Sequence, residues 1–111
     1  MKRGDVYLVD FGMPDGSEQG GRRPAIILMD DLLIPLYTTV TVVPLTTTLQ
    51  RVAMPGTVLI RAGEGGLDKD SVALGFQLQV RGKERLGRRL GALSPDRLAE
   101  VQEGVLRVLG A

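Results

Sequence analysis

The sequence predicts a mainly β protein, a small antiparallel barrel or strongly bent antiparallel sheet, with one helix after it. Short β-branched or alternating apolar segments follow one another along most of the chain, separated by turns rich in Gly, Pro and Asp. Apolar residues recur at helical spacing in one clear segment, at the C-terminal end. The connections contain no crossover helix, which argues against a parallel sheet. We expect a single domain spanning residues 1–111.

Five or six strands are expected. The first carries apolar residues on both faces, and the second is an apolar run opened by Pro24. The last reads as an edge strand with Gly87 and Gly91 as bulge or kink points. The expected strands are 5–11, 25–29, 38–45, 57–61, 71–80 and 85–93.

The helix has clear start and stop signals. Ser94 is a good N-cap, Pro95 fits the first helical position, and Asp96 suits the positive end of the helix dipole. Gly110 is a natural stop. Its apolar stripe favours packing on the core over an intermolecular contact, and consists of Leu98, Val101, Val105, Val108 and Leu109.

Composition excludes several classes of active site. The chain has no histidine and no cysteine, so a His-paired nucleophile, a two-histidine ribonuclease site and a His/Cys zinc site are all excluded. Carboxylate-held Mg²⁺ stays formally open, but the acids are scattered, and we expect neither a metal nor another cofactor. No signal peptide opens the chain and no apolar run approaches the roughly 20 residues of a membrane span, so we expect a cytoplasmic protein.

Cations gather in two places although the net charge is only +1. Five cations and one anion lie between Arg81 and Arg89, and Arg22 and Arg23 form a second pair beside glycines. Such a patch attracts a phosphate backbone, but a solvated polar face explains the longer cluster equally well.

The segment 16–24 joins the first two expected strands and is the most informative. Gly20 and Gly21 allow unusual dihedral angles and close approach of a ligand to the backbone. Arg23 precedes Pro24, which holds it extended at the mouth of a strand, with five donors shaped for phosphate oxygens. Glu18 is the acid nearest to it in sequence. The alternative is a mobile glycine-rich loop with incidental charges.

A second polar segment follows Pro44, at the expected end of a strand. The hydroxyls of Thr46 and Thr47 would there face a cleft, or they are simply strand-end residues.

These segments together resemble the MazF/PemK toxins over essentially the whole chain. The opening KRGDVYLVDF, the loop GSEQGGRRP and the later PLTT are similar to the first and second motifs of that family, in the same order. DSVAL, followed by Gln77 and KERL, resembles the third motif. The sequence departs from the family at Phe76, Gln79 and Gly82, which affects base preference and local dimer contacts but leaves Arg23 and Thr46 in place.

The resemblance implies an SH3-like barrel of the CcdB/PemK type, a homodimer, and a cognate antitoxin protein as partner. It also implies metal-independent, sequence-specific cleavage of single-stranded RNA, with attack by the neighbouring 2′-hydroxyl. The catalytic arginine and threonine of the family fall on Arg23 and Thr46. Substrate-binding positions fall on the loop and the other two motifs, at Ser17, Glu18, Gln19, Gly20, Gly21, Thr47 and Gln77.

Two other functions fit the same fold. CcdB-type toxins share the architecture but poison DNA gyrase, and inhibition of supercoiling without RNA cleavage would identify that function. A non-catalytic SH3-like module that binds RNA would use the same basic residues, and would bind RNA without strand scission.

Overall fold

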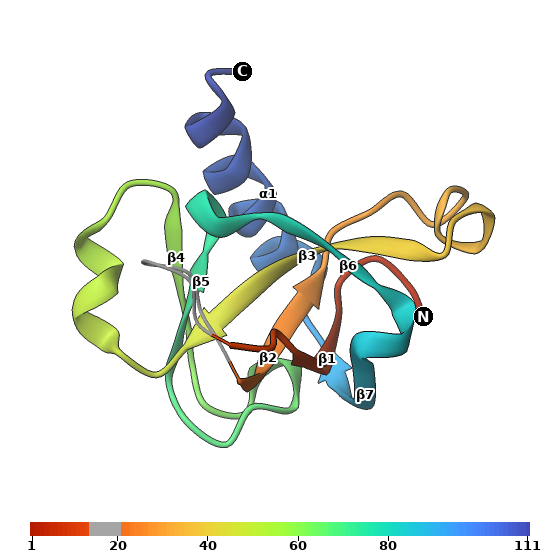
Figure 1. The fold of residues 1–111 in the computed structure, drawn as a ribbon. Coiled ribbons are helices and arrows are strands. Elements are labelled where there is room, and N and C mark those ends of the chain that lie inside the picture. Colours follow the sequence, from red (N-terminus) through yellow and green to blue (C-terminus); the bar gives the residue numbers. More distant parts are fainter. Residues whose placement is uncertain (14–20) are drawn as a thin grey trace.

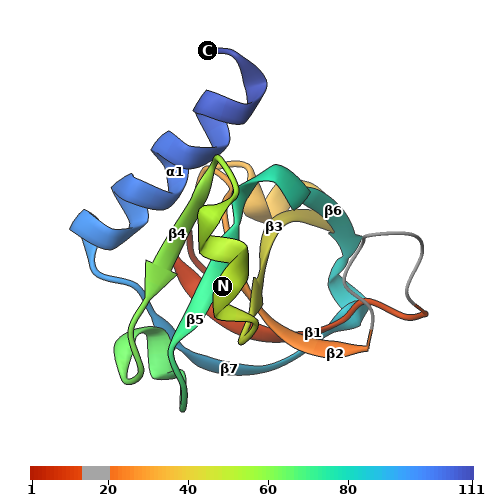
Figure 2. The same ribbon diagram turned by 90° about the vertical axis from the view of Figure 1, so that its left-hand side faces the viewer.

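The computed structural model describes residues 1–13 and 21–111. Within them, an antiparallel sheet curls into an open, barrel-like shape, and one α-helix lies along it (Figures 1 and 2). The expected fold class is confirmed. The sheet order is β4-β5-β3-β2-β1-β7, and β6 pairs with β3 off this path. The elements are β1 (Asp5–Asp10), β2 (Arg22–Ile27), β3 (Thr39–Thr46), β4 (Thr57–Ile60), β5 (Ser71–Leu74), β6 (Gln79–Gly82), β7 (Leu86–Ala92) and α1 (Pro95–Leu109).

The sheet is apolar on both faces, as the alternation in the first expected strand indicated. Val6 of β1 belongs to the main core, which also includes Ile26, Val43 and the buried side of α1. Val9 belongs to a second buried cluster on the opposite face, together with Phe11. The two faces therefore have different neighbours, and a residue's position along a strand decides which cluster it joins.

The predicted strand 71–80 is wrong as a single element. It divides into β5 and β6 around a short 3-10 turn, η4 (Gly75–Gln77). Continued from the pair Leu45↔Ala73, the register with β3 would set Val42 opposite Phe76, but Val42 is opposite Gln79. The three residues of η4 account for this shift. The apolar alternation continues across the break, which is why the sequence pattern concealed it.

The second strand begins earlier than predicted, at Arg22, so Pro24 lies inside it. Pro24 pairs with Leu8 of β1, whereas the ladder between β2 and β3 starts only at Ala25. The strand has one neighbour at Pro24, so the missing N–H interrupts no hydrogen bonding to β3.

Helix α1 begins and ends where the sequence predicts. The Ser94 hydroxyl accepts a hydrogen bond from the Arg97 N–H at 3.2 Å, and Gly110 closes the helix with φ of +79°. The first three residues of the apolar stripe are buried, whereas Val108 and Leu109 stay 44% and 66% exposed. In the described part of the chain, no helix is long and apolar enough to cross a membrane.

An ion pair fastens the first turn of α1 to the sheet. The Arg97 Nε donates to Glu64 Oε1 at 2.8 Å, and Glu64 starts the 3-10 turn η3 (Glu64–Gly66). The hydrogen bond from Arg97 lowers the pKa of Glu64 below its ordinary value of 4.5, and the Arg61 N–H adds to the effect. The pKa of the Arg97 guanidinium is raised by the same contact.

Replacing Gly91 or Gly87 of β7 by alanine is expected to change the stability of the fold to different extents. A Cβ at Gly91 would stand 2.6 Å from the Gly65 carbonyl carbon, whereas at Gly87 the nearest atom, the Leu8 oxygen, is 3.4 Å away. Gly91→Ala is expected to lower the free energy of unfolding by about 1–3 kcal/mol, because backbone must move. Gly87→Ala should change it little, and urea unfolding of both variants measures the difference. Equal effects would contradict this account.

The Glu64–Arg97 pair predicts a stability loss in acid. Because the folded pKa of Glu64 is lowered, its contribution is present above about pH 4.5 and disappears as pH falls through the folded value. Glu64→Gln should cost up to about 1 kcal/mol at pH 7 and lose less stability than wild type on acidification. Thermal unfolding between pH 7 and pH 3 tests this, with Glu103→Gln in α1, the helix that carries Arg97, as control.

Candidate active site

Arg23 and Thr46 lie beyond the same end of the β2–β3 ladder, on neighbouring strands. Arg23 is the second residue of β2, and Thr46 is the last residue of β3. The two strands pair in the register Ala25↔Pro44, and carrying that register two residues further sets Arg23 opposite Thr46. A cavity lined by both Pro24 and Thr47 independently shows that the two strand ends are adjacent. Segments more than twenty residues apart in sequence therefore supply the two predicted catalytic side chains.

Arg23 emerges from a rigid part of the sheet. It is half-buried, lies opposite Val9 of β1, and shares a strand face with Ala25 and Ile27 of the second apolar cluster. Pairing with β1 holds the backbone of Arg23 in place, and the following Pro24 restricts it further. The planar guanidinium presents its donors in a fixed arrangement, so it loses less entropy for each hydrogen bond to an anion than a lysine would.

Thr46 is buried, with 5% of its surface exposed, and its hydroxyl oxygen accepts a hydrogen bond from the Thr48 N–H at 3.2 Å. That bond occupies a lone pair and leaves the hydroxyl proton for another acceptor. Thr47, the next residue, is exposed and lines the cavity shared with Pro24. The alternating directions of Thr46 and Thr47 therefore place one threonine on each side of the strand end.

Gln77 is the last residue of η4, the turn that bridges the pairing of β3 with β5 and with β6. The turn contacts β3, and Gln77 is half-buried there. The Gln79 side chain donates a hydrogen bond to the Gln77 carbonyl at 3.0 Å, which fixes the turn. The break in the predicted strand thus brings the third-motif glutamine alongside the strand that ends in Thr46.

Four predicted site residues, Ser17, Glu18, Gln19 and Gly20, lie outside the described residues. Gly21 is described, and backbone hydrogen bonds join it to the two residues that follow β1. Its N–H donates to the Gly12 carbonyl at 2.6 Å, and its own carbonyl accepts from the Phe11 N–H at 2.9 Å. Its φ of +72° is in the left-handed region that glycine adopts readily, and a Cβ there would meet open space.

Arg51 makes a contact next to Gln77 that the sequence did not indicate. It belongs to the 3-10 turn η2 (Leu49–Ala53), which follows β3 after Thr46. Its guanidinium carbon lies 5.5 Å from the centre of the Phe76 ring, and Phe76 directly precedes Gln77. This contact ties the segment after Thr46 to η4. No local pattern could have revealed it, because Arg51 and Phe76 meet only in the folded chain.

The basic segment between Arg81 and Arg89 is not one patch. Arg81 lies over the Phe11 ring at 5.4 Å, Arg85 pairs with Asp10 at 3.7 Å, and Lys83 donates to a backbone carbonyl. Arg89 pairs with the buried carboxylate of Asp5 at 3.2 Å. Four of the five cations therefore have partners, and of the five only Arg88 lines the cavity that contains Thr47.

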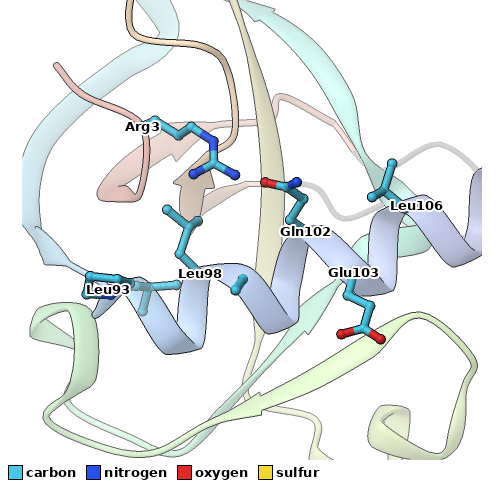
Figure 3. Close-up of a pocket in the computed structure, with 8 residues that line it drawn as sticks. Arg3, Leu93, Leu98, Gln102, Glu103 and Leu106 are labelled. Atoms are coloured by element: carbon cyan, nitrogen blue, oxygen red, sulfur yellow. The ribbon is translucent and has the colours of Figure 1, made fainter.

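Two cavities are relevant to the location of the site. One of ≈ 290 Å³ includes Pro24, Thr47 and Arg88. The other, of ≈ 450 Å³, lies between Arg3 and α1, where Leu98 and Gln102 face it (Figure 3). The second contains none of the described site residues. Among residues 1–13 and 21–111, no group of three or more acidic side chains is placed to hold a metal ion.

Comparison with known proteins shows the family of this chain. The family described as PemK-like, MazF-like toxins of type II toxin–antitoxin systems matches residues 2–109. The chain belongs to this family. Endoribonuclease MazF of Staphylococcus saprophyticus is 39% identical over 110 residues, which cover 99% of this chain and 92% of that protein.

Solved structures agree with that assignment. MazF from Deinococcus radiodurans superimposes with a TM-score of 0.85 at 26% identity, covering 100% of this chain and 97% of that one. An endoribonuclease in complex with its cognate antitoxin, from a mycobacterial species, gives a TM-score of 0.81 at 26% identity and covers 99% and 95%. The resemblance inferred from the motifs is thereby confirmed.

Proposed function

We propose that this chain is the toxin of a toxin–antitoxin pair and acts as a metal-independent endoribonuclease that cuts single-stranded RNA at specific sequences. The observation that supports the proposal is that β2 and β3 carry Arg23 and Thr46 at the same end of their ladder. Kinship with proteins named as endoribonucleases favours cleavage over a CcdB-like effect on gyrase and over a non-catalytic binding module.

RNA carries its own nucleophile, which explains how so few groups suffice. The 2′-oxygen attacks the adjacent phosphorus, the bond from phosphorus to the 5′-oxygen breaks, and the products are a 2′,3′-cyclic phosphate and a 5′-hydroxyl. One proton leaves the 2′-hydroxyl and one reaches the departing 5′-oxygen. The protein orients the attack in line and stabilises the added negative charge, and fixed donors supply most of that effect.

Arg23 and Thr46 are suited to charge stabilisation. The Arg23 guanidinium offers parallel donors to the two non-bridging oxygens. Thr46 donates its hydroxyl proton to the same phosphate, because its oxygen already accepts from the Thr48 N–H. Arginine is a poor proton acceptor, so Glu18, the acid nearest to Arg23 in sequence, is the better candidate for that task on electrostatic grounds.

Binding of substrate involves the remaining predicted residues. We propose that Ser17, Glu18, Gln19, Gly20 and Gly21 line the RNA groove and that Thr47 and Gln77 extend it. Aromatic residues are few, so recognition would come from backbone and polar side chains on splayed bases more than from a stacking platform.

We further propose a cytoplasmic homodimer that is inhibited by a cognate antitoxin protein. One solved neighbour is an endoribonuclease with its cognate antitoxin, and another is a MazE–MazF complex from Deinococcus radiodurans. Large apolar side chains remain exposed around η1 (Ile34–Leu36) and on β6, including Leu32 at 81%, Leu36 at 70% and Val80 at 55%. Apolar surface of this kind supports a protein–protein contact.

Loss of the Arg23 guanidinium is expected to abolish most activity. Arg23→Ala should reduce kcat by about 10²-fold or more, as for removal of one fixed donor that stabilises charge. Arg107→Ala, which removes the same charge from the far end of α1, should leave kcat unchanged. The assay is cleavage of end-labelled RNA in excess EDTA. Near-normal activity of Arg23→Ala would remove Arg23 from catalysis, and cleavage of a substrate with deoxyribose at the cut position would contradict the 2′-hydroxyl mechanism.

The hydroxyl of Thr46 is expected to matter more than its shape. Thr46→Val keeps a β-branched side chain but removes the donor to a charged group, which is worth about 1.5–3 kcal/mol, so kcat should fall by about 10- to 100-fold. Thr46→Ser keeps the hydroxyl and should retain most of the activity. Urea unfolding of both variants separates loss of chemistry from loss of fold. Equal kcat values for the two variants would show that the hydroxyl does not act on the phosphate.

A further inference from the structure

The cavity of ≈ 290 Å³ lies across the strand end from the predicted catalytic pair. Two of its lining residues, Pro24 and Thr47, directly follow Arg23 and Thr46 in sequence. Because successive side chains of a strand point to opposite faces, these neighbours project away from the catalytic side. An RNA strand that places a phosphate at the Arg23–Thr46 pair needs only to pass over the end of the β2–β3 ladder to reach the cavity.

Two cations line this cavity, Lys69 from the segment before β5 and Arg88 from β7. Arg22 of β2 does not line it but reaches β7 next to Arg88, with its Nη1 3.8 Å from the place where a Cβ at Gly87 would stand. Within residues 1–13 and 21–111, the structure gives none of these three side chains an ion pair or a hydrogen bond.

The cations that flank Arg88 in sequence differ from it, because both form ion pairs. Arg85 and Arg89 lie on either side of Arg88 along the chain, and each is paired with an aspartate of β1. Those two aspartates pair with Arg85 and Arg89, whereas Arg88 lines the cavity and, within the described residues, forms no ion pair. An unpaired guanidinium beside a second free cation is suited to phosphate oxygens.

The rest of the lining suits a nucleobase. Leu8, Leu67 and Leu90 provide apolar contact, and Asp68 and Thr47 provide polar groups at the rim. The Ser71 hydroxyl is buried in the wall and donates to the Lys69 carbonyl at 3.0 Å, which fixes the backbone that carries Lys69. Splayed bases of single-stranded RNA are held in this way, by an apolar contact and by hydrogen bonds at their edges.

We propose that this cavity is a subsite for the nucleotide that flanks the scissile phosphodiester. The base enters between the leucines, and Arg88 with Lys69 binds the phosphate of that nucleotide, while Arg22 extends the cationic path toward Arg23. The proposal rests on the proposed ribonuclease function and deepens it, because it assigns the residues that bind the substrate beyond the bond that is cut.

The experiment combines one substitution with shortening of the substrate. Arg88→Ala is expected to raise KM for a long RNA about 10-fold with kcat retained, because a contact made equally before and during reaction is lost. Removing the flanking nucleotides one at a time, from the 5′ side and separately from the 3′ side, should raise KM of the wild type on one side. Arg88→Ala should be insensitive to that same removal. Arg107→Ala is the matched control for net charge and should behave as wild type.

A binding measurement separates this proposal from the function on which it rests. Fluorescence anisotropy with the same oligonucleotides, carrying deoxyribose at the cut position, reports the subsite without turnover. If the wild type cuts no RNA but Arg88→Ala still removes the dependence of binding on length, the subsite stands and the nuclease function fails. If cleavage is normal but both proteins lose equal affinity on shortening, or if Arg107→Ala matches Arg88→Ala, the subsite is overturned.

Discussion

Strand β3 pairs with β2 along one edge and with both β5 and β6 along the other, and the positions of the site residues depend on this sharing. The two partners on the second edge are offset by the three residues of η4. A Cβ at Gly75 would stand 2.3 Å from the Gly56 carbonyl oxygen, so the turn requires glycine at its start. Without that offset, Gln77 would continue the regular pairing of β5 with β3 and lie opposite Thr41, instead of in the turn between the two ladders.

The sheet also separates two chemical environments. One face is closed by α1 and forms the main core, and the other carries the second apolar cluster. Arg23 shares a strand face with the second cluster, whereas Pro24 and Thr47 border the cavity that contains Arg88. Because side chains alternate across a β-strand, the end of the β2–β3 ladder has two sides. In the proposed function, one side binds the reacting phosphate, and the other binds the RNA that continues from it.

The proposed chemistry explains why this site needs few kinds of functional group. Internal attack by the 2′-hydroxyl removes the need for a protein nucleophile, and a chain without histidine or cysteine then needs positioning and fixed positive charge. Cations with partners maintain the fold, as Arg97 does with Glu64 and Arg89 does with Asp5. Arg88 and Lys69, in contrast, line the cavity beside Pro24 and Thr47, and within residues 1–13 and 21–111 neither side chain forms an ion pair.

The sequence by itself determined the features that depend on neighbouring residues. The caps of α1 at Ser94 and Gly110 act within one turn of the chain, and the strand that ends in Thr46 is specified by its β-branched run. The order of motifs further identified the family, and with it the pair Arg23 and Thr46. Their roles in cleavage remain predictions for the substitutions described above.

Only the tertiary structure decided what depends on contacts between distant segments. The apolar alternation of residues 71–80 was compatible with one strand, because a period of two continues unchanged through η4, and the break appears only in the register with β3. The basic run that ends at Arg89 looked uniform, although Asp5 and Asp10 of β1 engage two of its members and leave Arg88 facing a cavity. Arg51 and Phe76 likewise meet only in the folded chain. Pairings of this kind are set by the folding of the sheet, and local sequence carries no signal for them.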